Sequence, residues 1–176
     1  AFSAFGLASH SQDIVHSIPA PGSKCQDVAW DGENIWVADN TTRMYYKVDP
    51  EDGSVLHSIT FPILAPYSEG ITFDGQYLWT CGWQEPGGDG SKIFKVDPES
   101  GDVIDSFTYP EGEEDNWPHG LTFDGTNLWA NNFNSNTLDK IDPMTGNLLT
   151  TIPAPGSFSI GIAWDGNYLW TDDFHQ

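Results

Sequence analysis

One short signal recurs four times in this 176-residue sequence and constrains the fold more than any other feature. An aromatic residue followed by Asp-Gly occurs at 30–32, 73–75, 123–125 and 164–166, with spacings of 43, 50 and 41 residues. A second signal, Lys-Val-Asp-Pro or Lys-Ile-Asp-Pro, follows in three of the units, at 47–50, 95–98 and 140–143. Such self-similarity indicates a repeat architecture in which each unit packs against its neighbours.

Each unit reads as four short strands. In the first unit we expect strands at 27–30, 34–38, 44–48 and 54–59. Asp-Gly and Asp-Pro-x-x-Gly supply the residues that tight turns between strands require. No segment shows the 3.6-residue period and caps of a helix. Four strands in a unit of this length are typical of a propeller blade. We therefore predict one all-β domain, a four-bladed β-propeller with four antiparallel strands per blade.

The fourth unit contains only two of its four strands, and the N-terminus supplies the rest in our interpretation. The stretch IPAPGS occurs at 18–23 and again at 152–157, so the N-terminal residues match the third and fourth strands of a unit. The predicted blades span about 24–62, 67–110, 117–153, and 158–176 together with 1–19. Mixing the two termini in one sheet closes the ring as a monomer. Exchange of the same strands between two chains, giving a domain-swapped dimer, is the alternative.

The repeat resembles those of streptogramin lyases, plant-type glutaminyl cyclases and related NHL-like and YVTN-like propellers. The resemblance rests on motifs such as WDGNYLW at 164–170 and KVDPESG at 95–101, and it covers almost the whole chain. Resemblance to the lyases implies a cluster of His and Glu around a metal, for which this chain offers His119 and Glu69, with His175 nearby. Resemblance to the cyclases implies an acidic residue in a Trp-lined pocket, which Glu69 with Trp83 and Trp117 would supply.

The chain is strongly acidic, with 6 basic and 26 acidic residues and a formal charge of −20. Such a surface repels phosphate backbones and anionic membranes, so we expect neither nucleic acid nor a membrane as partner. A cationic ligand or a divalent metal suits this negative field better than an anionic partner does. The simpler interpretation is that the acidic surface keeps the protein soluble in an extracellular setting. Cys25 and Cys81 are compatible with one disulfide or two free thiols and do not fix the compartment.

The two ends of the predicted blades differ in character. The Asp-Gly and Asp-Pro-x-x-Gly turns share one face, where their aspartates are turn residues. The opposite face gathers the more variable loops, where a rigid fold usually carries function. The candidate ligand-binding residues on that face are Gln26, Asp27, Glu69, Trp83, Trp117, His119, Asn132, Asp173 and His175.

Two kinds of chemistry are open at this face. Glu69 and His119 are the candidate catalytic residues, because His titrates near neutrality and a carboxylate beside it can exchange protons. Asp39, Asp172 and Asp173 are candidate ligands for Ca²⁺ or Mg²⁺, although no cofactor is certain. The alternative for all of these residues is that they are ordinary solvated loop residues.

The sequence supports two hypotheses about function. The first is a non-catalytic binding or interaction module for a small molecule, a glycan or a protein, using the variable-loop face. The second is a metal-assisted small-molecule enzyme of the lyase or cyclase kind. Nothing in the residues themselves decides whether the protein is an enzyme.

Overall fold

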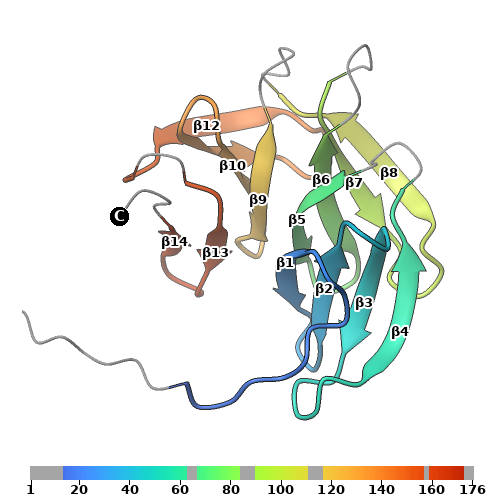
Figure 1. Ribbon diagram of the computed structural model, residues 1–176. Helices are drawn as coiled ribbons and strands as arrows, with labels where there is room; N and C mark the ends of the chain where they lie inside the picture. Colours follow the sequence, from blue (N-terminus) through green and yellow to red (C-terminus); the bar gives the residue numbers. More distant parts are fainter. Residues whose placement is uncertain (1–13, 63–66, 84–89, 111–116, 157–158, 173–176) are drawn as a thin grey trace, which may run out of the picture.

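The computed structural model describes residues 14–62, 67–83, 90–110, 117–156 and 159–172. These residues form antiparallel β-sheets joined by turns, as Figure 1 shows. No helix occurs in the described ranges, and hence none there is long and apolar enough to cross a membrane.

Three sheets have four strands each, in simple chain order. The first contains β1 (Cys25–Trp30), β2 (Ile35–Asp39), β3 (Met44–Val48) and β4 (Val55–Thr60). The second contains β5 (Tyr67–Phe73), β6 (Leu78–Trp83), β7 (Lys92–Val96) and β8 (Val103–Thr108). The third contains β9 (Pro118–Phe123), β10 (Leu128–Asn132), β11 (Thr137–Ile141) and β12 (Leu148–Pro153). The fourth sheet pairs β13 (Ile162–Trp164) with β14 (Leu169–Thr171).

The sheets follow one another around a common centre, with the first strand of each sheet innermost (Figure 1). Successive inner strands contact one another, β1 with β5, β5 with β9, and β9 with β13. The predicted all-β class and the strands of the first three repeats are confirmed, because the pairing of adjacent strands follows the repeat along the chain. The fourth sheet is small in the described residues, and the number of blades in a closed ring stays a prediction.

The aspartate of each Asp-Gly turn does more than shape the turn. Its Oδ1 accepts hydrogen bonds from backbone amides two and three residues on, as Asp31 does from Glu33 and Asn34. Its Oδ2 accepts a hydrogen bond from the indole Nε1 of the tryptophan five residues on. The four bonds are Asp31–Trp36 at 3.1 Å, Asp74–Trp79 at 2.7 Å, Asp124–Trp129 at 2.8 Å and Asp165–Trp170 at 2.7 Å. Each repeat thus fixes the orientation of its tryptophan from its own turn.

A lysine on the third strand completes this arrangement in the first three sheets. Lys47 Nζ lies 3.1 Å from Asp31 Oδ2 and 5.9 Å from the ring centre of Trp36. Lys140 stands in the same relation to the Asp-Gly aspartate and the tryptophan of the third sheet, at 3.1 Å and 5.3 Å. In the second sheet Lys95 Nζ lies over two aromatic rings. In the first and third sheets the lysine therefore connects the turn to the second strand by a charged and an aromatic contact, and in the second sheet the aromatic contacts alone are seen.

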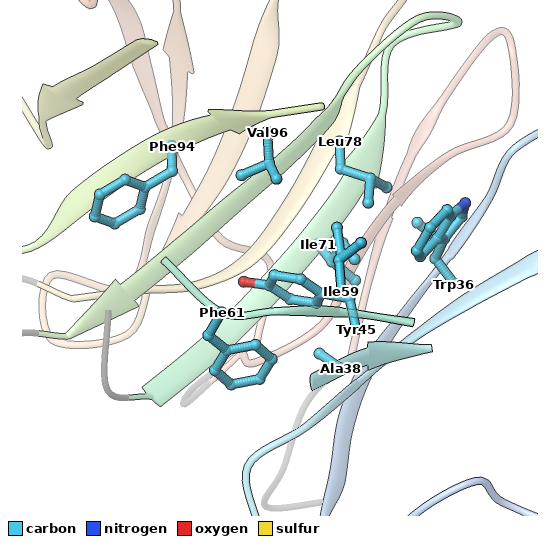
Figure 2. Packing of buried hydrophobic residues seen from close by; sticks show 10 residues of the cluster. Trp36, Ala38, Tyr45, Ile59, Phe61, Ile71, Leu78, Phe94 and Val96 are labelled. Atoms are coloured by element: carbon cyan, nitrogen blue, oxygen red, sulfur yellow. The ribbon is translucent and has the colours of Figure 1, made fainter. Parts of the chain in front are cut away.

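The core lies between neighbouring sheets, where the tryptophan of one sheet meets aliphatic side chains of the next. Figure 2 shows the first of these interfaces, in which Trp36 packs near Ile71, Leu78 and Val96 of the second sheet. The second interface is built around Trp79 and the third around Trp129. Large aromatic side chains bury the most apolar area per residue, which makes these interfaces the main source of stability.

The fourth tryptophan departs from the pattern. We predict inter-blade packing for all four, and Trp36, Trp79 and Trp129 are only 1%, 1% and 9% exposed. Trp170 is 61% exposed, so the prediction is wrong for this residue in the structure. The physical reason is that no further sheet of the described residues lies against its face.

The N-terminal segment lies where the outer strand of the fourth sheet is expected, but it does not form the backbone hydrogen bonds of a strand. Residues 14–20 form no strand, and the predicted inner partner at 3–7 lies outside the described residues. Yet His16 Nε2 lies 3.0 Å from Glu51 O, as His57 Nε2 of β4 lies 3.0 Å from Glu99 O. Ile18 also borders Gly53, as Ile59 of β4 borders Gly101. These contacts match those of an outer strand, but the predicted third strand of the fourth sheet is not described. Closure of the ring therefore stays a prediction.

The aspartate–tryptophan bond gives a direct stability test. Asp124→Ala removes the acceptor of Trp129 Nε1 and of two backbone amides, and it leaves Lys140 without its carboxylate. We expect the free energy of unfolding to fall by about 2 to 3 kcal/mol in urea titrations. The control is Asp102→Ala, whose side chain is exposed, and for which we expect a change within about 0.5 kcal/mol. Equal effects of the two substitutions would refute the role assigned to the bond.

Candidate functional site

The inner strands approach each other so closely that the residue at one position is restricted. A Cβ atom at Gly70 would lie 2.8 Å from His119 O, and one at Gly120 would lie 2.6 Å from Ile160 O. Asp27 occupies the equivalent position in β1. Its Oδ2 accepts a hydrogen bond from Ile71 N, and its Oδ1 accepts one from Val28 N, both at 2.9 Å. A carboxyl group therefore stands where the other inner strands have only glycine.

Asp27 has an altered proton affinity for a clear reason. Its side chain is packed between two inner strands, and this burial raises its pKa from 3.8 to about 7, against the opposing effect of the two amide donors. Desolvation favours the neutral form of a carboxyl group, and no counter-ion among the described residues offsets it for Asp27. A carboxyl group with this pKa changes its charge near neutral pH.

Glu69 and His119 are brought together, as their register positions in neighbouring inner strands predict. His119 Nδ1 lies 3.6 Å from Glu69 Oε2, and the two side chains are 19% and 23% exposed. Burial raises the pKa of Glu69, which the charge of Lys24 partly opposes, and burial lowers the pKa of His119. Both groups thus favour their neutral forms more than free side chains do, and a proton can be held by either. The imidazole also packs against Phe133, with ring centres 4.9 Å apart.

We call Asp27, Glu69 and His119 the inner-strand cluster. A pocket of about 380 Å³ adjoins it between the first and fourth sheets, and Asp27, Val28, Trp170 and Asp172 are among its lining residues. Asp172 Oδ1 accepts hydrogen bonds from Ile160 N at 2.7 Å and Gly161 N at 2.8 Å. Two carboxyl groups from opposite ends of the chain therefore face one pocket.

The carboxylate of Asp39 is occupied by hydrogen bonds from nearby residues of the chain. Its side chain is fully buried and accepts hydrogen bonds from Lys24 N, Thr41 N, Thr42 N and Thr42 Oγ1. Burial alone would raise the pKa of Asp39, but the donors, Thr42 N and Lys24 N first, outweigh it and hold the pKa low. These bonds use the lone pairs that a metal ion would need, and they attach the segment before β1 to the loop after β2.

Some of the remaining predicted site residues lie in the described parts of the chain, and others do not. Asn132 is buried, and its Oδ1 accepts a hydrogen bond from Ser135 N at 3.2 Å. Gln26 is exposed and Trp117 is partly buried, while Trp83 ends β6. Asp173 and His175 lie outside the described residues, as do the loops at 84–89 and 111–116. Among the residues that the structure describes, no group of three or more His, Cys, Asp and Glu could hold a metal ion.

The two cysteines are free thiols, which settles the alternative left open by the sequence. Cys81 is fully buried, and its Sγ donates to Pro118 O at 3.2 Å. Burial, together with the charges of Asp27 and Glu69, raises the pKa of this thiol well above its usual value. Cys81 is therefore unreactive near neutral pH.

Comparison with known proteins identifies the fold of the chain but does not assign a function to it. No family model matches the sequence, and no curated protein matches it. Among solved structures, the chain is similar to glutaminyl cyclase from Myxococcus xanthus, with a TM-score of 0.68 and 12% sequence identity. The match covers 86% of this chain and 62% of that enzyme. The fold is that of a β-propeller.

Two further structures share the propeller architecture. A protein of unknown function from Bacteroides caccae matches with a TM-score of 0.56 and 19% identity, over 86% of this chain and 54% of that one. Hydrazine synthase from Kuenenia stuttgartiensis matches with a TM-score of 0.58 and 17% identity, over 86% of this chain and 43% of that one. The present chain thus spans less than two thirds of each of these propeller proteins.

The raised pKa of Asp27 predicts a pH dependence of stability. The folded state holds this proton more tightly than the unfolded chain, so the contribution is fully present below about pH 4 and is lost as the pH rises through about 7. We expect the free energy of unfolding of the wild type to fall by roughly 1 to 3 kcal/mol relative to Asp27→Asn between about pH 4 and pH 8.

Comparing the wild type with Asp27→Asn isolates the contribution of Asp27 to the free energy of unfolding, because Glu69 and His119 titrate in both proteins. His119 acts in the opposite direction, since its lowered pKa adds stability as the pH rises through the unfolded value of 6.5. Chemical unfolding at a series of pH values measures both curves. Parallel curves for the wild type and the variant would show that Asp27 keeps an ordinary pKa.

Proposed function

We propose that the protein is a non-catalytic ligand-binding module that takes small organic cations in the pocket beside Asp27. The observation that carries the proposal is that the partly buried carboxyl group of Asp27 and the carboxyl group of Asp172 line one pocket of about 380 Å³. Carboxyl groups held in their neutral form by burial gain most from a cationic partner, because the cation restores the charged form. The formal charge of −20 adds long-range attraction for cations.

The proposal includes the manner of binding. A cation in the pocket would lie between Asp27 on β1 and Asp172 after β14, with the indole of Trp170 as an apolar wall. Pockets of this kind combine apolar lining with a few polar groups that fix orientation. Because Asp27 is partly protonated near pH 7, cation binding releases protons from the protein. Proton release is a signature that adsorption to a merely acidic surface would not give.

Ring closure is part of the same proposal, because it fixes the distance between the two walls of the pocket. The places of His16 and Ile18 support an arrangement in which residues 1–19 complete the fourth sheet. A chain lacking residues 1–19 should then unfold at a lower temperature and bind cations more weakly. Unchanged melting and binding after this deletion would leave closure without support.

Ligand binding can be tested by isothermal titration with choline, putrescine and arginine methyl ester, with neutral analogues of each as controls. We expect saturable binding of at least one cation, with proton release at pH 6.5 in two buffers that differ in ionisation enthalpy. Asp27→Asn and Asp172→Asn should each weaken binding about tenfold or more. Glu51→Gln, on the exposed Asp-Pro-x-x-Gly turn of the opposite face, is the matched control and should bind as the wild type does.

The second candidate function is proton-transfer catalysis by Glu69 and His119, favoured by their 3.6 Å separation and opposed pKa shifts. The similarity to a glutaminyl cyclase suggests the first substrate to try, a peptide with N-terminal glutamine. Cyclisation that is lost in Glu69→Gln would establish this candidate instead. Saturable binding of glycans but of no cation would contradict the cation proposal, and so would cation binding unaffected by Asp27→Asn.

A further inference from the structure

The interfaces between neighbouring sheets hold a tryptophan ring at one recurring set of positions. Trp36 of the first sheet lies in one core cluster with side chains from the first, second and third strands of the second sheet, namely Ile71, Leu78 and Val96 (Figure 2). Trp79 lies in a cluster with the corresponding side chains of the third sheet, which are Leu121, Leu128 and Ile141. Each of these sheets therefore presents three aliphatic side chains that receive an indole ring.

The first sheet presents the same set, and there it lines a pocket. Counted from the repeat motifs, the equivalent side chains are Val28, Ile35 and Val48. They border a pocket of about 270 Å³, which is also lined by Cys25, Val37 and residues 18–21. We call it the ring pocket. An apolar cavity of about 150 Å³ suffices for benzene, so the ring pocket has room for a bicyclic aromatic group.

The ring pocket is apolar and adjoins the pocket beside Asp27. The thiol of Cys25 is the one polar side-chain group in its lining, and such a lining favours an uncharged ring, because a charged group there would lose its hydration. Val28 lines both the ring pocket and the pocket of about 380 Å³ to which Asp27 and Asp172 contribute. An apolar site and a site with two carboxyl groups thus meet at one side chain.

We propose that the cation bound by this protein is an arylalkylamine, a planar aromatic ring that carries an ammonium group on a short chain. The ammonium group lies at Asp27 and Asp172, and the ring occupies the ring pocket against Val28 and Val48. Burial of the ring adds affinity in proportion to the apolar area that leaves water. The place of the ammonium group rests on the proposed function, whereas the ring pocket follows from the repeat alone.

Isothermal titration with tryptamine, n-butylamine and 3-methylindole tests the two ends of the ligand separately. We expect tryptamine to bind about 30-fold or more tightly than n-butylamine, because only tryptamine buries a ring. 3-Methylindole, which lacks the ammonium group, should also bind more weakly than tryptamine. Ile35→Ala should weaken tryptamine binding about three- to tenfold and leave n-butylamine binding unchanged. Ile104→Ala, at an exposed isoleucine of β8, is the matched control and should change neither.

The thiol of Cys25 gives a second readout, because it lines the ring pocket. Its alkylation by iodoacetamide, followed by mass spectrometry, should slow about tenfold when tryptamine is present at ten times its dissociation constant. n-Butylamine at the same multiple of its own dissociation constant should leave the rate unchanged. Cys81 is fully buried and serves as the unreactive reference thiol.

The outcomes separate this proposal from the cation pocket on which it builds. Equal affinities for tryptamine and n-butylamine would overturn the arylalkylamine assignment and leave the cation pocket standing. Tryptamine binding unaffected by Ile35→Ala, or alkylation of Cys25 unaffected by tryptamine, would place the ring elsewhere and overturn the assignment as well. Binding of 3-methylindole as tight as that of tryptamine, with none of n-butylamine, would instead contradict the ammonium site beside Asp27.

Discussion

The hydrogen bond from a tryptophan indole to the aspartate of the preceding Asp-Gly turn is the interaction on which the structure depends. It occurs in all four repeats, at 2.7 to 3.1 Å. The aspartate holds the turn with one oxygen and the indole with the other, so the turn between two strands also sets the direction of the largest core side chain. Packing between sheets then follows, because the oriented Trp36, Trp79 and Trp129 each meet aliphatic side chains of the next sheet.

A repeat of this kind makes departures from it informative. The inner strands leave room only for glycine at 70 and 120, and Asp27 at the same position instead directs a carboxyl group to the backbone of the next sheet. This departure places a carboxyl group where the repeat itself has no structural use for one. Asp27 is the residue on which the proposed cation pocket depends.

Much of the fold could be predicted from the sequence because the repeat carries its own turn chemistry. Strands β3, β7 and β11 lie where Asp-Pro-x-x-Gly indicates, and Glu69 meets His119 because both lie near the start of neighbouring inner strands. The aspartate–tryptophan bond is not among the predictions, although the constant spacing of five residues, as between Asp31 and Trp36, is the signal that indicates it. Trp170 was misjudged, since repeat position alone does not say whether a neighbouring sheet covers it. The burial of Asp39 could not be foreseen, because it depends on Lys24 and Thr42 meeting it in space.

Hydrogen exchange of the indole N–H groups, measured residue by residue by NMR, tests the central claim most directly. Trp36, Trp79 and Trp129 donate to aspartates and are at most 9% exposed, whereas Trp30 is 57% exposed. The structure predicts slow exchange at the three buried indoles and fast exchange at Trp30. For Trp170, bonded to Asp165 but exposed, an intermediate rate is expected. Exchange at Trp36, Trp79 and Trp129 as fast as at Trp30 would contradict the account.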